Sequence, residues 1–371
     1  MHKFFRYFFL TAIFLTVIGC EGLKNSAKNI FESSERAKYE RRFSGADSLL
    51  AGWKKSYSEA VNSRLEVKDG FVATLNYKAE DLDAVGYMID LKKGDLLIAE
   101  AGNGAAGSQI FVDFFELQGT QQSSESKKLE NGTYSKFIEK AATYRIVIQP
   151  EIGFSGKFNL RIYTQPSISF PVAGKGNRDI QSFWGANRDG GARSHEGVDI
   201  FAARGTPVVA AVNGMVTRTG NSGLGGKQVW LRDGILGNSL YYAHLDRIMT
   251  EGGRNVKIGD TLGTVGNTGN AEGGAPHLHF GIYTMGGATD PYPYIRKREI
   301  PAFKTADDYD SVNIKSGSNM RSGPGLDFET VGTVEEGVSA KVLAASGDWL
   351  HVKTEANLEG FLSKSRISIQ D

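Results

Sequence analysis

Two short strings constrain most strongly how this 371-residue chain can fold. In one, His277 and His279 flank a leucine, and in the other His195 and Asp199 lie four residues apart with Gly197 between them. Successive side chains on a strand point to opposite faces, so an even offset places both members of each pair on one face. On a helix His277 and His279 would diverge, and Gly197 disfavours a helix. The strings therefore predict strands that present these side chains together.

The six histidines of the chain are unevenly distributed, because His195, His244, His277 and His279 all fall between residues 195 and 280. Two neutral imidazoles and one carboxylate are a common zinc ligand set, and three protein ligands leave a fourth position open, as a catalytic site requires. Calcium and magnesium prefer all-oxygen sites. An exposed polar sheet face would explain a lone H-x-H string, but two strings with a third histidine favour a zinc site.

Further short strings surround these histidines in a fixed order. They are Phe170-Pro171, Trp184 to Gly191, Gly205 to Val208, Gly214 to Val216, Tyr242 to Leu245, Val256 to Asp260, Gly263 to Gly269 and Asp290-Pro291. From about Phe170 to Tyr294 the chain resembles the lysostaphin/LytM-type zinc endopeptidases, which cut peptide bonds in bacterial cell-wall peptidoglycan. The resemblance implies one Zn²⁺ per chain with His195, Asp199 and His279 as ligands, and His277 and His244 as the catalytic histidines.

The first twenty residues predict a targeting segment. Lys3 and Arg6 give it a positive start, and residues 7–18 form an apolar run too short to span a bilayer comfortably. The segment ends at Cys20, the only cysteine, in a string that resembles a bacterial lipobox. We therefore expect residues 1–20 to be a lipoprotein signal peptide, with Cys20 lipidated and the protein anchored to a membrane of the cell envelope. A plain signal peptide or an uncleaved anchor is the alternative.

Composition limits the fold class and the partners. The chain has 43 basic and 42 acidic side chains, and this balance argues against a nucleic-acid partner. Its 46 glycines, separated by aromatic and β-branched runs, predict many turns and short strands. The expected fold class is therefore mainly β, and the length suggests two or three domains.

The residues after the leader predict a helical segment followed by a sandwich. Residues 21–63 are expected to be a tether with helices over 31–43 and 46–61, the charges between Glu35 and Arg42 forming a solvated face. The second helix should bury one apolar stripe, made of Leu49, Leu50, Trp53, Tyr57 and Val61. Residues 64–165 predict a β-sandwich, with strands over 71–77, 85–91, 96–99, 109–117, 144–149 and 157–163. The module loosely resembles pre-peptidase modules of secreted bacterial enzymes. A spacer role and a ligand-binding role are equally compatible with its sequence.

The second half predicts two further domains. Residues 166–295 are the expected LytM-type zinc peptidase domain, which is β-rich, and residues 296–309 are a charged linker. Residues 310–371 resemble a bacterial SH3-like domain, a small β-barrel, through strings such as Asn319 to Gly325, Trp349 to Val352 and Gly360 to Leu362. Such domains in cell-wall enzymes often hold the wall peptide. His351 alternates with two apolar residues on a predicted strand, so we expect it to belong to the barrel and not to a metal site.

Two arginines, a glutamate and a glycine-rich run lie in the same region of the sequence as the histidines. Arg188 and Arg193 either meet a substrate carboxylate or lie on the surface. Glu196 is expected to face away from the metal, because its offset from His195 is odd. The glycine-rich residues 219–226 lack the ending of a phosphate loop and predict a hairpin turn that walls a groove.

The function expected from these features is hydrolysis of peptide cross-links between peptidoglycan stems. His277 is the expected general base, and His244 is expected to hydrogen-bond the water or the developing oxyanion. Two alternatives are a metal-free LytM-like regulator that activates a cell-wall amidase and a wall-binding lipoprotein that acts through its barrel.

Overall fold

The computed structural model describes residues 34–102, 107–117, 122–129, 132–234, 237–304 and 309–369. The predicted signal peptide and Cys20 lie outside the described residues. Within those ranges the fold is mainly β, as the sequence predicted, and three α-helices accompany the strands. None of the helices in the described part of the chain is long and apolar enough to cross a membrane.

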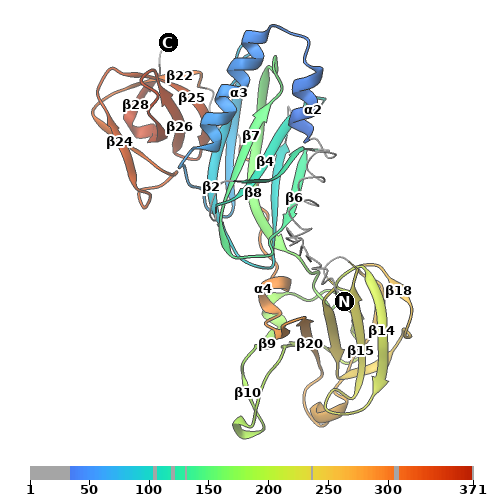
Figure 1. Ribbon diagram of the computed structural model, residues 1–371. Coiled ribbons are helices and arrows are strands. Elements are labelled where there is room, and N and C mark those ends of the chain that lie inside the picture. The colour runs from blue at the N-terminus through green and yellow to red at the C-terminus, as the bar shows by residue number, and fades with distance from the viewer. Residues whose placement is uncertain are drawn as a thin grey trace, which may run out of the picture.

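Two antiparallel sheets form the N-terminal sandwich (Figure 1). In spatial order, one sheet contains β1 (Phe71–Tyr77), β8 (Gly156–Pro166), β3 (Asp95–Gly102) and β6 (Thr133–Phe137). The other contains β2 (Val85–Leu91), β7 (Ala142–Pro150), β4 (Ile110–Glu116) and β5 (Gln122–Lys128). The six predicted strands are present, with small differences at their ends. The alternation predicted neither β5, an edge strand that is polar throughout, nor β6, the edge strand of the other sheet.

The predicted helical segment is confirmed as α2 (Glu35–Arg42) and α3 (Asp47–Val61). α3 covers the outer face of the β2–β7–β4–β5 sheet, so β7 is buried on both of its faces. Trp53 anchors this contact, because it is buried and its indole nitrogen donates to the Pro150 carbonyl at 2.9 Å. The prediction that Leu49 belongs to the buried apolar stripe is wrong, because this residue is 39% exposed.

Arg36 contradicts the expectation that all charges of α2 are solvated. Its side chain is buried, and its guanidinium donates to Asp113 at 2.7 Å and to Gln149 at 2.6 Å. It also lies over the rings of Trp53 and Tyr57. The cause is Asp113 on β4, a fully buried carboxylate that needs an opposite charge in the same dry environment.

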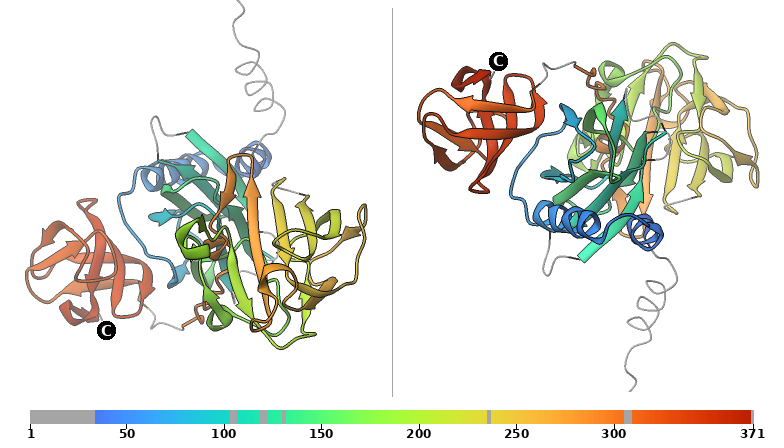
Figure 2. Two further views of the ribbon diagram at one scale, coloured as in Figure 1. Left: turned by 90° about the horizontal axis from the view of Figure 1, so that it is seen from below. Right: turned by 90° about the horizontal axis from the view of Figure 1, so that it is seen from above.

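The C-terminal barrel consists of short strands around its own apolar core. They are β22 (Ser311–Ile314), β23 (Ser318–Arg321), β24 (Thr330–Val334), β25 (Ser339–Ser346), β26 (Trp349–Thr354), β27 (Glu359–Ser363) and β28 (Ile367–Ile369). The barrel lies against the side of the sandwich (Figure 2), where β25 pairs with β1. Phe361 packs on Phe71 and Tyr87, so part of the barrel belongs to the sandwich core.

His351 occupies this contact and lies on β26, as its alternation predicted. Its side chain is fully buried. Nδ1 lies 2.9 Å from the Tyr87 hydroxyl of the sandwich, and Nε2 lies 2.8 Å from a Glu359 carboxylate oxygen. His351 therefore joins the barrel to the sandwich.

Residues 168–295 form two packed sheets at the end of the sandwich away from α2 and α3 (Figure 1). The larger sheet has the order β18 (Asn255–Val256), β14 (Gly214–Asn221), β15 (Lys227–Asp233), β16 (Ser239–Ala243), β20 (His277–Thr284), β12 (Val198–Phe201) and β9 (Ile180–Ser182), with β21 (Gly287–Thr289) paired to β20. The smaller sheet contains β13 (Pro207–Val209), β19 (Thr261–Val265) and β17 (Leu245–Ile248). A small hairpin, β10 (Asn187–Arg188) and β11 (Arg193–Ser194), and the helix α4 (Tyr292–Ile295) complete this part.

The core of this part lies between the two sheets, and β20 shows how it is built. Leu278, Phe280 and Ile282 point into the core and are fully buried. His277 and His279, at the intervening positions, therefore lie on the opposite, outer face of the larger sheet. The hydrophobic alternation of β20 thus determines which face carries the polar residues.

Candidate metal centre

The pairing of β12 with β20 brings the two predicted strings together. Asp199 lies opposite His279 in this register, and Phe201 lies opposite His277. The offset argument for His195 was wrong in one respect, because His195 precedes β12 and does not lie on a strand. It reaches the same space from the segment between β11 and β12.

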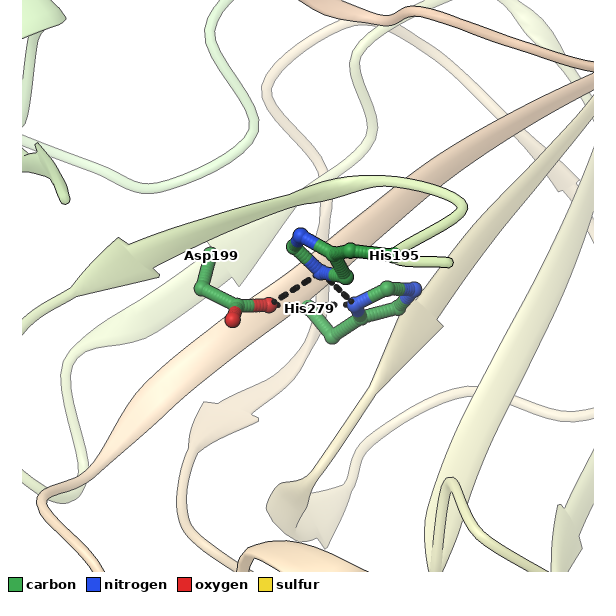
Figure 3. Close-up of side chains that lie close together, drawn as sticks. All are labelled: His195, Asp199 and His279. Atoms are coloured by element: carbon green, nitrogen blue, oxygen red, sulfur yellow. Dashed lines mark hydrogen bonds and ion pairs between the residues drawn. The ribbon is translucent and has the colours of Figure 1, made fainter. Parts of the chain in front are cut away.

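Three side-chain atoms converge at one point (Figure 3). His195 Nε2 and Asp199 Oδ1 are 3.0 Å apart, Asp199 Oδ1 and His279 Nδ1 are 3.0 Å apart, and the two imidazole nitrogens are 2.9 Å apart. Zinc–ligand bonds of 2.0–2.2 Å in a tetrahedron separate the ligand atoms by about 3.3 Å. Small outward shifts of the three side chains would therefore suffice to admit such an ion.

Outer hydrogen bonds decide which nitrogen of His195 faces this point. His195 Nδ1 lies 2.9 Å from the Phe183 carbonyl oxygen, which can only accept, so the neutral imidazole carries its proton on Nδ1. Nε2 then presents a lone pair toward Asp199. When His279 carries its proton on Nε2, its Nδ1 also presents a lone pair, and a cation between the three atoms would then offset their mutual repulsion. The donor set, two imidazoles and a carboxylate, fits zinc better than calcium or magnesium.

The electrostatics of the site keep the donors in the forms that a cation binds. Burial raises the pKa of Asp199, but its contacts with His195 and His279 lower it by more, so the pKa lies well below its ordinary value. Burial lowers the pKa of His279. Asp199 is therefore a carboxylate and His279 a neutral imidazole at neutral pH, as metal ligation requires.

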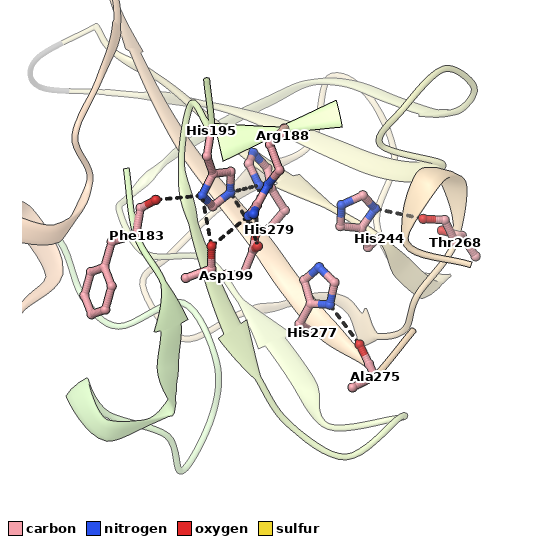
Figure 4. A network of polar contacts seen from close by, with 10 residues as sticks. Phe183, Arg188, His195, Asp199, His244, Thr268, Ala275, His277 and His279 are labelled. Atoms are coloured by element: carbon pink, nitrogen blue, oxygen red, sulfur yellow. Dashed lines mark hydrogen bonds and ion pairs between the residues drawn. The ribbon is translucent and has the colours of Figure 1, made fainter. Parts of the chain in front are cut away.

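Two further imidazoles border the triad of His195, Asp199 and His279 (Figure 4). The ring centroid of His244 is 5.1 Å from that of His277 and 5.9 Å from that of His279. His277 Nδ1 donates to the Ala275 carbonyl at 2.9 Å, and His244 Nδ1 donates to the Thr268 carbonyl at 2.8 Å. In its neutral form each ring therefore keeps a lone pair on Nε2 for a proton or a hydrogen bond.

His244 has an unusual backbone conformation. It lies between β16 and β17 with a φ of 62°, in the left-handed region that non-glycine residues rarely occupy. Such strained backbone is frequent at functional sites, where the surroundings hold it. Burial lowers the pKa of His244 to about 4, so the ring is neutral near pH 7.

The glycine-rich residues 219–226 form the predicted hairpin between β14 and β15. The hairpin approaches the site closely, since Gly225 accepts a hydrogen bond from the backbone of His244 at 2.8 Å. A Cβ atom at Gly225 would collide with the hydroxyl of Tyr241, whose ring lies 5.8 Å from that of His279. Glycine is required here because no side chain fits between this loop and the sheet.

Arg188 has a position that sequence reasoning did not predict. Its guanidinium points at Asp199 and donates to Oδ2 at 2.6 Å, so it touches one of the three converging residues directly. A basic residue a few positions before His195 was the only available signal. Glu196 is exposed, as expected for a residue that faces away from the triad.

Comparison with known proteins identifies two domains in the chain. Residues 193–291 match the sequence model of Peptidase family M23, and residues 316–368 match that of the Bacterial SH3 domain. This chain carries an M23 peptidase domain followed by a bacterial SH3 domain. All the residues of the site described above, apart from Phe183 and Arg188, lie inside the M23 match.

Curated relatives of the M23 domain include endopeptidases. An L-Ala–D-Glu endopeptidase of Bacillus subtilis is 37% identical over 143 residues, which are 35% of this chain and 44% of that protein. The peptidoglycan DD-endopeptidase ShyC of Vibrio cholerae is 28% identical over 47% of this chain and 40% of its own length. The chain thus spans about half the length, or less, of these curated relatives. A solved structure of the lysostaphin catalytic domain from Staphylococcus simulans is 30% identical and covers 35% of this chain and 91% of its own, with a TM-score of 0.27.

Proposed function

We propose that this protein is a zinc-dependent endopeptidase that hydrolyses peptide cross-links of bacterial peptidoglycan. The observation that carries the proposal is the convergence of three metal-binding atoms within 3.0 Å of one another, beside two imidazoles that keep a free lone pair. The peptidoglycan endopeptidases among the M23 relatives support the substrate class.

His195, Asp199 and His279 would hold one zinc ion through Nε2, Oδ1 and Nδ1. When bound, zinc supplies a Lewis acid that polarises the scissile carbonyl and lowers the pKa of water. The protein supplies the rest of the chemistry. His277 lies on the same face of β20 as His279, so its Nε2 lone pair can take the proton of the attacking water and deliver it to the leaving amine.

The structure favours one of the two roles considered for His244. The proton on Nδ1 is used by the Thr268 carbonyl, and the low pKa keeps the ring neutral. A neutral ring in this tautomer can only accept at Nε2 and cannot donate to an oxyanion. We therefore assign His244 to orienting the water by accepting one of its hydrogens.

The alternatives explain less of the site. A metal-free regulator of an amidase would have no need for three converging donors, and a lipoprotein that only binds the wall would leave five buried or half-buried polar side chains without a role.

We also propose that the SH3 domain holds the wall peptide, and that lipidated Cys20 anchors the protein in the cell envelope. We further propose that the sandwich module begins at residue 64, the peptidase domain at residue 166, the linker at residue 296 and the SH3 domain at residue 310.

Digestion of purified sacculi tests the proposal. Protein lacking residues 1–20 should release soluble peptide fragments, and mass spectrometry of their new ends identifies the bond that is cut. Treatment with a chelator should stop the release, and added zinc should restore it. Undiminished digestion by protein that has been shown to contain no metal would refute the metal assignment.

A further inference from the structure

Arg188 contacts the metal centre from outside the triad (Figure 4). Its Nη2 donates to Asp199 Oδ2 at 2.6 Å and to Ser182 Oγ at 2.7 Å. The arginine side chain is 30% exposed and the aspartate side chain 9% exposed, so protein atoms shield most of the pair. Charge-assisted hydrogen bonds of this kind are among the strongest in proteins.

The two carboxylate oxygens of Asp199 have different surroundings. Oδ1 faces His195 Nε2 and His279 Nδ1, at the point where the three donors converge. Oδ2 is bound by the guanidinium of Arg188. A carboxylate can bind a metal through one oxygen or through both. Arg188 therefore competes with a metal for Oδ2, whereas Oδ1 faces the other two donors.

We propose that Arg188 is a positioning residue that restricts Asp199 to one-oxygen coordination of the metal and so keeps a coordination position free for water. This inference rests on the proposed zinc site. Two-oxygen coordination by Asp199 would occupy a position that a catalytic zinc site leaves open. Arg188 need not touch the substrate to have this effect.

The small hairpin of β10 and β11 contacts both His195 and Asp199, and the Arg188–Asp199 hydrogen bond is one of these contacts. Arg188 lies on β10, which pairs with β11 directly before His195, and the His195 backbone bonds Ala186 and Gly185. Ser182, the second acceptor of Arg188, lies within 3.4 Å of His195 Nδ1. One short segment, residues 182–188, therefore orients His195 and Asp199 together.

Metal binding by variants tests this inference without measuring hydrolysis. Arg188→Ala should weaken zinc affinity, measured by competition with a chromophoric chelator, by about 10- to 100-fold, as loss of such outer contacts typically does. Cobalt substituted for zinc should show weaker visible absorption in this variant, because its coordination number rises. Arg188→Lys keeps the charge but loses the planar fork, so it should recover part of the affinity. Arg254→Ala, an exposed arginine of the same domain, is the control and should bind zinc like the wild type.

Wild-type zinc affinity and cobalt absorption in Arg188→Ala would overturn the inference, even if hydrolysis fell, because Arg188 would then act on the substrate. Millimolar guanidinium added to Arg188→Ala should restore part of the affinity. If circular dichroism shows that Arg188→Ala does not fold, the test uses Arg188→Lys and Ser182→Ala instead. Unchanged metal binding in both variants would refute the positioning role of Arg188. Failure of the proposed function is a separate result, since the wild type itself would then bind no zinc or cut no peptide.

Discussion

Asp199 on β12 lies directly opposite His279 on β20, and Asp199 Oδ1 is 3.0 Å from His279 Nδ1. Eighty residues separate the two in the sequence, so the register of one pair of strands builds the centre. A shift of that register by one residue would turn each side chain to the other face of the sheet. The apolar alternation of β20, which must face the core, prevents the shift.

Asp199→Ala is expected to remove metal binding. It deletes one of three ligands and leaves Arg188 without its acceptor, so zinc content should fall from about one per chain toward none. Zinc at 100 times its dissociation constant should stabilise the wild type by about 2.7 kcal/mol and the variant by none. Metal analysis and thermal unfolding with and without zinc measure both effects. The exposed Glu251→Ala is the control, and a zinc-dependent melting shift in Asp199→Ala would contradict the assignment.

His277→Ala is expected to separate metal binding from catalysis. The variant loses the base that faces the water but keeps all three converging donors. Turnover of a soluble cross-linked peptide should fall by about 10²–10⁴-fold, the usual contribution of a general base, while zinc content stays unchanged. His195→Ala should lose both properties and so calibrates the assay. An unaltered kcat would remove His277 from the mechanism.

Phe361→Ala is expected to destabilise the sandwich as well as the barrel. Phe361 is fully buried against Phe71 and Tyr87, so its truncation should cost about 3–5 kcal/mol in the free energy of unfolding. Urea unfolding, monitored at residues of each part, measures the loss. Leu326→Ala, at an exposed leucine of the same barrel, should change it little. A loss confined to the barrel would show that the two parts unfold separately.

The ion pair of the buried His351 with the half-buried Glu359 predicts a dependence of stability on pH. Burial raises the pKa of Glu359, but His351 and Lys353 lower it by more, so the folded pKa lies below the ordinary value of 4.5. A depressed carboxyl pKa contributes stability above the unfolded pKa, and this stability is lost as the pH falls through the folded pKa. Urea unfolding between pH 7 and pH 3 should therefore show a loss in the acid range. Glu359→Gln should reduce it, and identical acid profiles for both proteins would argue against the contribution.

Sequence reasoning succeeded where the signal is local. The period-two alternation located β20 and the main strands of the sandwich, because one face of each strand must be apolar. It failed for the edge strands β5 and β6. The polar β5 shows no apolar alternation, because the neighbouring strand supplies its hydrogen bonds and no apolar face is needed. It also failed for Arg36, whose burial depends on Asp113, 77 residues away in the sequence.

Within the candidate metal centre, residue types and spacing predicted that two pairs of side chains gather, and the resemblance to the lysostaphin/LytM-type endopeptidases named His195, Asp199 and His279 as the ligands. Only the tertiary structure decided how each is held. The carbonyls of Phe183, Thr268 and Ala275 select which nitrogen keeps its lone pair, and Arg188 selects which oxygen of Asp199 is available. Most of these partners come from other loops and strands, and hydrogen bonds depend on distances of a few tenths of an ångström that no sequence pattern encodes.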